Sequence, residues 1–169
     1  TLRKKMISLA GEIAEGVVFA NGSCSHMSES LDVLPPEKRN DQNFFIGNMI
    51  PTCVYEDESV AAEVNRKTLV PYTLLENYRN YWKEAGYEEE MAYVEKAINE
   101  GGDPEAIGAC LSDKWLSDNT LFGRPSKVLA GLEAWYESGI TTPILVPSSA
   151  QGNQLKAIQE VFDLCARLK

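Results

Sequence analysis

The sequence predicts an α/β protein with parallel strands, and two observations lead to that prediction. The first is the short apolar run Val17–Ala20, which follows an amphipathic helix without a break. A run this short and this apolar is typical of a strand covered on both faces, as in a parallel sheet wrapped by helices. The second is the order of elements, because helices alternate with three such strands along the chain, and this alternation indicates crossover connections.

The opening helix is predicted from apolar residues at steps of three and four, which places them on one helical face. They are Leu2, Met6, Leu9 and Ile13. Gly16 ends this pattern before the strand Val17–Ala20. The turn Asn21–Ser25 then leads into a helix over His26–Leu34, with Ser25 as a candidate N-cap.

Two further strands are expected. Phe44–Tyr55 is rich in β-branched and aromatic residues, and Pro51 predicts a bend, a bulge or two shorter pieces within it. The last strand is expected at Thr142–Val146. Because both runs are bounded by helical patterns, they fit the same parallel sheet as Val17–Ala20.

The segment between the second and the last strand is predicted to be mainly helical. Acidic residues at Glu56–Glu58 suit the start of its first helix, and Asp103 followed by Pro104 marks a later helix start. A further helix is expected between Gly123 and Gly139. The final helix is predicted to face the core with one apolar stripe. That stripe is Leu155, Ile158, Val161, Phe162, Cys165 and Leu168.

Length and charge limit the classes of function. At 169 residues, the chain 1–169 is expected to form a single domain with one core. Its formal charge of −9 argues against a nucleic-acid backbone or an anionic membrane as a partner. No apolar stretch approaches the ~20 residues of a membrane span, and nothing resembles a signal peptide, so a cytoplasmic location is expected.

The cysteines predict neither a metal site nor disulfides. Four cysteines are scattered without CxxC spacing, and His26 is the only histidine, so no zinc site is expected. In a cytoplasmic chain all four cysteines are expected to be reduced. They are Cys24, Cys53, Cys110 and Cys165.

The first twenty residues also carry a resemblance. LRKKMISLAGEIAEGVVFAN closely resembles a motif of luciferase-like monooxygenases, with a dense match over Leu9–Ala14 and at Gly16. The sequence departs from the family at Glu15, where the family usually has Asp. The resemblance implies a flavin- or deazaflavin-dependent oxidoreductase built on a (β/α)8 barrel.

Two later segments resemble the same family in the same order. Val70-Pro71-Tyr72 with Tyr78–Tyr87 resembles one family segment, and Gly123–Pro147 resembles its closing run. A complete barrel takes roughly 250 residues. The resemblance therefore implies the C-terminal portion of a TIM barrel, its last three or so βα units, with the N-terminal strands absent from this chain.

The resemblance also implies a cofactor site. In related deazaflavin enzymes the backbone before the opening helix and the end of the following strand hold the cofactor's phosphate and adjoining groups. By position this implicates four residues as cofactor-binding: Leu2, Arg3, Ala20 and Asn21. A helix N-terminus suits an anion, and Arg3 could add charge-assisted contacts. A solvated basic cluster and an ordinary Asn-Gly turn are the alternatives for Arg3 and Asn21.

Four more residues are candidates near the strand ends. In relatives the position of Ser23 faces the substrate, although a helix cap explains Ser23 as well. His26 follows the strand end and is a candidate catalytic proton donor, with a surface histidine as the alternative. Ser148 and Ser149 could contact an anion after the last strand or cap the final helix.

Two functions are therefore expected from the resemblance. The first is the C-terminal part of an oxidoreductase that transfers a hydride through FMN or a deazaflavin (coenzyme F-420), with a small-molecule substrate in the full-length protein. The second is a non-catalytic half-barrel that self-associates without binding cofactor, because half a barrel has two open sheet edges and an uncovered apolar face. Either a homo-oligomer or pairing with the missing half is expected, and enzymatic activity of the isolated chain is left open.

Overall fold

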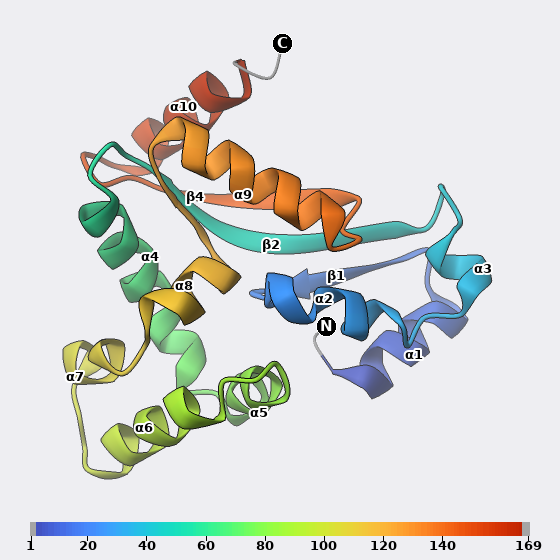
Figure 1. Cartoon of the computed structure of the whole chain (residues 1–169), viewed down its shortest axis with the longest axis horizontal. Coiled ribbons are helices and arrows are strands. Elements are labelled where there is room, and N and C mark those ends of the chain that lie inside the picture. Colours follow the sequence, from blue (N-terminus) through green and yellow to red (C-terminus); the bar gives the residue numbers. More distant parts are fainter. Residues whose placement is uncertain (1–2, 167–169) are drawn as a thin grey trace.

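Strand β2 (Phe45–Val54) is the centre of the fold, and β1 (Gly16–Ala20), β3 (Leu121–Gly123) and β4 (Thr142–Ser148) all pair with it in parallel. The structure is a computed structural model that describes residues 3–166, and Figure 1 shows its helices distributed around this sheet. The helices are α1 (Lys4–Ile13), α2 (Cys24–Leu31), α3 (Pro36–Arg39), α4 (Glu58–Thr73), α5 (Glu76–Glu84), α6 (Glu88–Asn99), α7 (Pro104–Ala109), α8 (Asp113–Asn119), α9 (Pro125–Glu137) and α10 (Gln154–Cys165).

The strand register fixes the order of the sheet. β1 pairs with the first half of β2, from Gly16 beside Phe45 to Ala20 beside Met49. β3 and β4 both pair with Thr52 and Cys53, so they lie on opposite edges of β2. β1 and β3 therefore follow one another along one edge, and β4 occupies the other edge. The prediction that the first, second and last predicted strands are parallel neighbours is confirmed.

Pro51 does not divide β2, contrary to the expected alternative of two shorter pieces. The N–H of Phe45 donates to Glu15 and the N–H of Tyr55 donates to Gly123, so odd-numbered residues of β2 face the edge shared by β1 and β3. Pro51 faces this edge between the end of β1 and the start of β3, where no ladder hydrogen bond is lost. The Asn65 amide fills the gap by donating to the carbonyls of Pro51 at 3.3 Å and Leu121 at 2.9 Å.

Strand β3 has only three residues, and it lies where the sequence predicts the start of a helix. Leu121 and Phe122 are buried, and Gly123 has a φ of +110° that a side chain would disfavour. A run this short shows no periodicity. Its strand character comes from pairing with the end of β2.

Helices α9 and α10 lie on opposite faces of the sheet. A side chain at Gly131 of α9 would clash with Leu121, which is the register partner of Thr52 in β2. Glu160 of α10 lies near Cys53, the next residue of β2. Successive strand residues point to opposite faces, so α9 covers the Thr52 face and α10 covers part of the Cys53 face. Burial and the nearby carboxylate of Glu160 raise the pKa of Cys53 to about 11.

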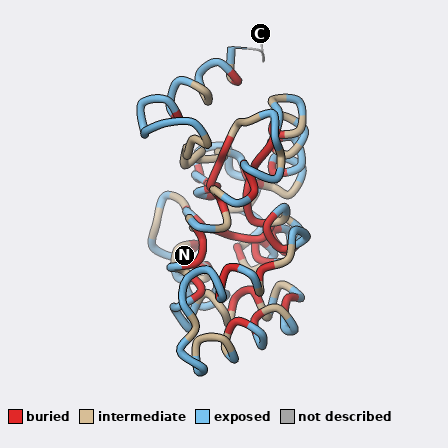
Figure 2. Tube along the Cα trace, turned by 90° about the vertical axis from the view of Figure 1, so that its left-hand side faces the viewer, coloured by how far each residue is buried: buried red, intermediate tan, exposed pale blue. Residues whose placement is uncertain are grey.

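The apolar stripe predicted for the final helix is wrong. Leu155 and Phe162 are 76% and 66% exposed, and Figure 2 shows α10 as a largely exposed helix beside the C-terminus. The helix packs instead through Ala157 and Leu164, which are buried. Leu168 lies outside the described residues.

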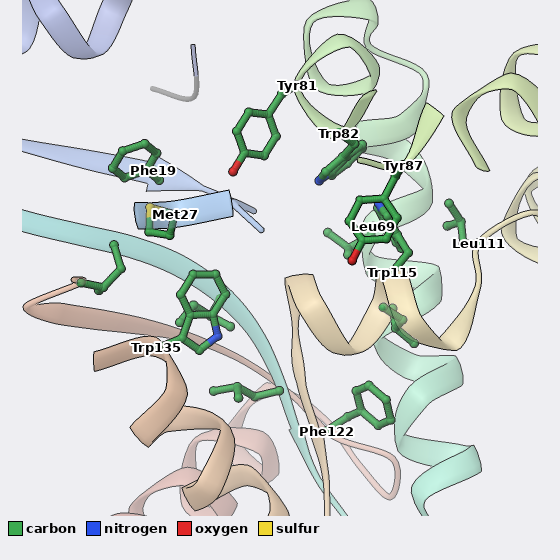
Figure 3. Close-up of a cluster of buried hydrophobic side chains, with 14 of the residues drawn as sticks. Phe19, Met27, Leu69, Tyr81, Trp82, Tyr87, Leu111, Trp115, Phe122 and Trp135 are labelled. Atoms are coloured by element: carbon green, nitrogen blue, oxygen red, sulfur yellow. The ribbon is translucent and has the colours of Figure 1, made fainter. Parts of the chain in front are cut away.

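The largest core side chains come from the helices rather than from the strands. Trp82 and Trp115 are fully buried and meet edge to face, with ring centroids 4.8 Å apart. Figure 3 shows Tyr81, Trp82, Tyr87 and Trp115 gathered in one cluster beyond the end of β1. This cluster joins α5 and α8. Through it, the helices between β2 and β3 pack against the end of the sheet.

Helices α5 and α6 are joined by an ion pair whose strength should depend on pH. The hydrogen bond from Lys83, together with Arg79, holds the pKa of Glu95 below its ordinary value of 4.5. Because the folded pKa is depressed, the stabilisation is present above pH 4.5 and is lost as the pH falls through the folded pKa.

Glu95→Gln is expected to lower the free energy of unfolding by about 0.5–1 kcal/mol at pH 7 and by less at lower pH. Urea unfolding at several pH values measures this, with exposed Glu89→Gln as the control. If Glu95→Gln lowers the free energy of unfolding by the same amount at every pH, the proposed role of this ion pair is contradicted.

Candidate active site at the end of strand β1

The loop after β1 is the most strongly constrained part of the sheet's carboxyl edge. Asn21 has a φ of +56°, the one left-handed non-glycine residue within residues 3–166. Asparagine tolerates this conformation better than most residues, and such strain occurs often at functional sites. The Asn21 N–H donates to the Met49 carbonyl at 3.1 Å, and the Gly22 N–H donates to Asn48 Oδ1 at 3.2 Å. The loop is therefore fixed to the middle of β2.

Residues far along the chain hold the next part of the loop. The Ser23 N–H donates to Tyr81 Oη at 2.9 Å, and Ser23 Oγ donates to Asn119 Oδ1 at 2.8 Å. Asn119 Oδ1 also accepts from Trp82 Nε1 at 2.9 Å, while its Nδ2 donates to the Trp115 carbonyl. All of these groups are buried, so the hydrogen bonds are made away from water. Figure 3 shows the Tyr81 hydroxyl pointing toward the strands.

A second anchor follows two residues later. The N–H and Oγ of Ser25 both donate to the Asp118 carboxylate, at 2.8 and 2.7 Å. The Tyr87 hydroxyl donates to the same carboxylate at 2.9 Å. Ser25 therefore uses its side chain on Asp118, and the N-cap of α2 is Ser23, which makes no side-chain cap bond. The predicted cap at Ser25 is wrong by two residues.

Burial makes the phenols and the thiol beside this loop poor acids. Burial raises the pKa of Tyr81 to about 12, and burial with the Asp118 charge raises the pKa of Tyr87 as well. Burial, with Asp118 as the second cause, raises the pKa of Cys24 to about 11. These groups stay neutral near pH 7 and can serve as hydrogen-bond donors and acceptors, but not as anionic bases or nucleophiles.

The structure brings Arg3, one of the predicted cofactor residues, and the loop after β1 to the same helix, α5. Arg3, the N-cap of α1, forms an ion pair with Glu84, and Tyr81, which holds Ser23, lies one turn earlier on α5. The start of α1 and the end of β1 are thus tied to the same face of α5. Ala20 is half-buried at the end of β1, beside Met49. Leu2 lies outside the described residues.

The Asn21 side chain has unused hydrogen-bonding capacity. It is only 4% exposed, and its carboxamide has no hydrogen-bond partner in the part of the chain that the structure describes. Asn48, which holds Gly22, likewise has a buried Nδ2 without a partner. The amide groups of Asn21 and Asn48 at the strand end can therefore donate to and accept from a ligand that carries polar groups.

Ser23 and His26 are placed differently from what a contact with substrate requires. Ser23 has no exposed surface, and both of its donors are engaged. His26 is 8% exposed, with Nδ1 at 3.4 Å from Glu29 and its ring against Tyr81 at 5.8 Å. In this arrangement both side chains face the protein interior.

The end of β4 does not suit an anion. Ser149 Oγ donates to Glu160 at 3.2 Å, so an anion at this position would meet a carboxylate. The alternative interpretation, that Ser148 or Ser149 caps the final helix, is wrong. Asn153 is that cap, and its side chain accepts from the N–H groups of Leu155 and Lys156.

The comparison of the sequence with known families decides the family. The sequence model of the luciferase-like monooxygenases matches residues 1–142. The chain belongs to this family. Its fold is the matching partial α/β barrel with parallel strands, as the resemblance implied.

Solved structures agree on the fold. The coenzyme F-420-dependent tetrahydromethanopterin reductase from Methanopyrus kandleri superposes with a TM-score of 0.70 at 16% identity, over 95% of this chain and 47% of its own. An F-420-dependent secondary alcohol dehydrogenase, solved with an F-420–acetone adduct, superposes with a TM-score of 0.65 at 14% identity, over 98% of this chain and 46% of its own. This chain of the luciferase-like family therefore spans about half the length of both. No curated protein matches it.

Two further findings concern residues 3–166. No helix there is both long and apolar enough to cross a membrane. Within the same residues, no group of three or more His, Cys, Asp or Glu side chains could hold a metal ion. All four cysteines are free thiols.

The residues that shape the loop after β1 are not predictable from the sequence. Tyr81 is a buried core aromatic whose hydroxyl also holds Ser23. Asn119 and Asp118 were not identified at all. They lie 96 and 93 positions from the serines that they hold, and a lone amide or acid at a helix end gives no sequence signal for such a role.

Proposed function

We propose that this chain forms the cofactor-binding part of an oxidoreductase that uses coenzyme F-420, with FMN as the alternative cofactor. The observation that carries the proposal is the Asn21 carboxamide, almost buried at the strand end and without a protein partner within residues 3–166. The family match and the two F-420-dependent structural neighbours support the choice of cofactor class. When bound, such a cofactor supplies hydride transfer.

The donor set fits a cofactor that carries phosphate and amide-like groups. The Asn21 carboxamide offers both a donor and an acceptor at the end of β1. The first turn of α1 adds unpaired backbone N–H groups and the guanidinium of Arg3. Because Arg3 already pairs with Glu84, a bound phosphate competes with that carboxylate. Leu2 and Ala20 complete the proposed cofactor contacts through the backbone.

The remaining predicted site residues support the loop rather than the cofactor directly. Ser23 holds the loop to Tyr81 and Asn119, so it fixes where Asn21 stands and where a substrate would approach. His26 becomes available as a proton donor only if its contacts with Glu29 and Tyr81 open. A small-molecule substrate and a cytoplasmic location are proposed with this function, in keeping with four free thiols.

A titration with two cofactors tests the proposal. Coenzyme F-420 and FMN are added separately to the chain, and fluorescence polarisation of each cofactor reports binding. Asn21→Gly keeps the left-handed backbone and removes only the carboxamide, so we expect the fold to persist and the affinity for the preferred cofactor to fall about tenfold. Asn99→Gly, at an exposed position of α6, is the matched control.

Two results would overturn the proposed function. One is the absence of binding of either cofactor at about 1 mM, the weak end of specific recognition. The other is equal affinity of wild type and Asn21→Gly while circular dichroism shows both to be folded.

A further inference from the structure

Helix α2 lacks a side-chain cap of its own. Its N-cap residue is Ser23, whose side chain makes no cap hydrogen bond and donates to Asn119 instead. The first backbone N–H groups of a helix need acceptors from outside the helix. The N-cap side chain usually supplies the acceptor for the second or third helical residue. In α2 that acceptor comes from another part of the chain.

The acceptor is the carboxylate of Asp118, near the end of α8. Ser25 is the second residue of α2, and its N–H donates to Asp118 Oδ1 at 2.8 Å. The Ser25 hydroxyl donates to Oδ2 of the same carboxylate at 2.7 Å. The hydroxyl of Tyr87, the N-cap residue of α6, donates to Oδ2 at 2.9 Å. One carboxylate therefore joins the starts of α2 and α6 to α8.

The position of Asp118 is itself well fixed. The next residue, Asn119, is fully buried and accepts hydrogen bonds from Ser23 and Trp82. Strand β3 begins two residues after Asn119, at Leu121, and pairs with β2. Because Asp118 lies on this rigid support, it can determine where the first turn of α2 lies.

No cation neutralises the charge of Asp118. Among the residues that the structure describes, none forms an ion pair with its carboxylate, and Lys114, one turn earlier on α8, lies over the Tyr87 ring at 5.6 Å. Burial raises the pKa of three nearby groups, and the Asp118 charge adds to each rise. These groups are Cys24, Tyr81 and Tyr87. The start of α2 therefore lies in a negative electrostatic potential.

We propose that Asp118 is a positioning residue that acts through Ser25, capping α2 from another helix and excluding anions from its first turn. The N-terminus of a helix after a parallel strand ordinarily suits an anion. Here a carboxylate already occupies that place and repels a second negative charge. The start of α1, by contrast, carries Arg3 and two lysines. In one respect this inference rests on the proposed function: the anionic groups of a bound cofactor are directed to α1, and the ligand group that reaches α2 is uncharged or cationic.

Hydrogen exchange measured by NMR without cofactor tests this role. Asp118→Ala leaves the Ser25 N–H without its acceptor, so this amide is expected to exchange at least about tenfold faster than in wild type. Sodium formate at about 0.1 M supplies a carboxylate and is expected to restore at least half of the lost protection on a logarithmic scale. Sodium chloride at the same concentration is not expected to do so. The matched control is Asp113→Ala, because Asp113 lies on the same helix, is 85% exposed and pairs with Arg66. It is expected to leave Ser25 unchanged with or without formate.

Two further measurements test the charge of Asp118. Asp118→Asn keeps the size and one acceptor oxygen, so it also serves if Asp118→Ala does not fold. Because a hydrogen bond to a charged acceptor is about twice as strong as one to a neutral acceptor, Ser25 in this variant is expected to exchange about threefold faster than in wild type. Inorganic phosphate at about 10 mM is expected to shift the amides of Ser25 and His26 in Asp118→Ala and to leave them unchanged in wild type.

Three results would overturn the inference. They are unchanged exchange of Ser25 in both Asp118 variants, equal effects of formate and chloride on Asp118→Ala, and phosphate shifts at Ser25 and His26 that are as large in wild type as in Asp118→Ala. Failure of the proposed function is distinguishable from these results. In that case no variant and no wild type binds coenzyme F-420, while the exchange and formate results persist. If wild type binds coenzyme F-420 and Ser25 exchanges alike in all variants, the proposed function stands and this inference fails.

Discussion

Replacing Asn119 by leucine is expected to lower the free energy of unfolding by about 3 kcal/mol or more. The change removes the acceptor of both Ser23 Oγ and Trp82 Nε1, and the donor to the Trp115 carbonyl. Each buried group left without a partner costs about 1–3 kcal/mol. Because leucine has nearly the same size, packing losses are small and the lost hydrogen bonds dominate.

Urea unfolding followed by circular dichroism measures this change. Asn99→Leu, at an exposed position of α6, is the control and is expected to change stability by less than about 0.5 kcal/mol. A double-mutant cycle with Ser23→Ala isolates the Ser23–Asn119 hydrogen bond and is expected to give a coupling of about 1 kcal/mol. A loss below about 1 kcal/mol for Asn119→Leu would show that the anchor of the loop lies elsewhere.

Replacing Trp82 by alanine is expected to cost about 3–5 kcal/mol. Trp82 is fully buried, its ring meets Trp115 edge to face, and its indole N–H binds Asn119. The substitution leaves a large cavity between α5 and α8 and removes one donor from the loop anchor. For a domain of this size the melting temperature is expected to fall by about 10 °C.

Thermal unfolding of Trp82→Ala, compared with Tyr93→Ala, checks this result. Tyr93 is 62% exposed and lacks such packing, so its variant is expected to melt within a degree or two of wild type. Trp82→Phe is expected to lie between them, because it keeps part of the ring contact and loses the N–H. Equal melting temperatures for Trp82→Ala and Tyr93→Ala would contradict the role assigned to the aromatic cluster.

The sequence predicted the main strands because their apolar runs are distinct. β1 and β4 lie where the runs Val17–Ala20 and Thr142–Val146 indicated. The uninterrupted course of β2 could not be predicted, since it depends on the gap between β1 and β3 that accommodates Pro51. Strand β3 is defined by pairing alone, which local sequence does not reveal.

The faces of the terminal helices were harder to predict than the helices themselves. The periodicity of α10 is real, but two adjacent faces of that helix carry apolar residues, and the buried face is the one with Ala157 and Leu164. For α1 the apolar stripe exists as predicted and is exposed. Periodicity identifies a face but does not say which surface covers it.

The position of the candidate site was predictable, and its construction was not. The end of the first strand follows from the rule that ligands gather at the carboxyl ends of parallel strands. The hydrogen bonds that Tyr81, Asn119 and Asp118 accept from this loop depend on the path of the five helices between β2 and β3. That path brings α5 and α8 beside the end of β1, as Figure 1 shows, and no local motif encodes it.

Backbone amide shifts, recorded by NMR while coenzyme F-420 is added, test the central claim most directly. If the loop after β1 is the cofactor site, the amides of Asn21, Gly22 and Ser23 shift and saturate together, and the Asn119→Leu variant loses these shifts or shows them at higher concentration. Saturable shifts confined to other parts of the chain, with Asn21–Ser23 unchanged, would contradict it.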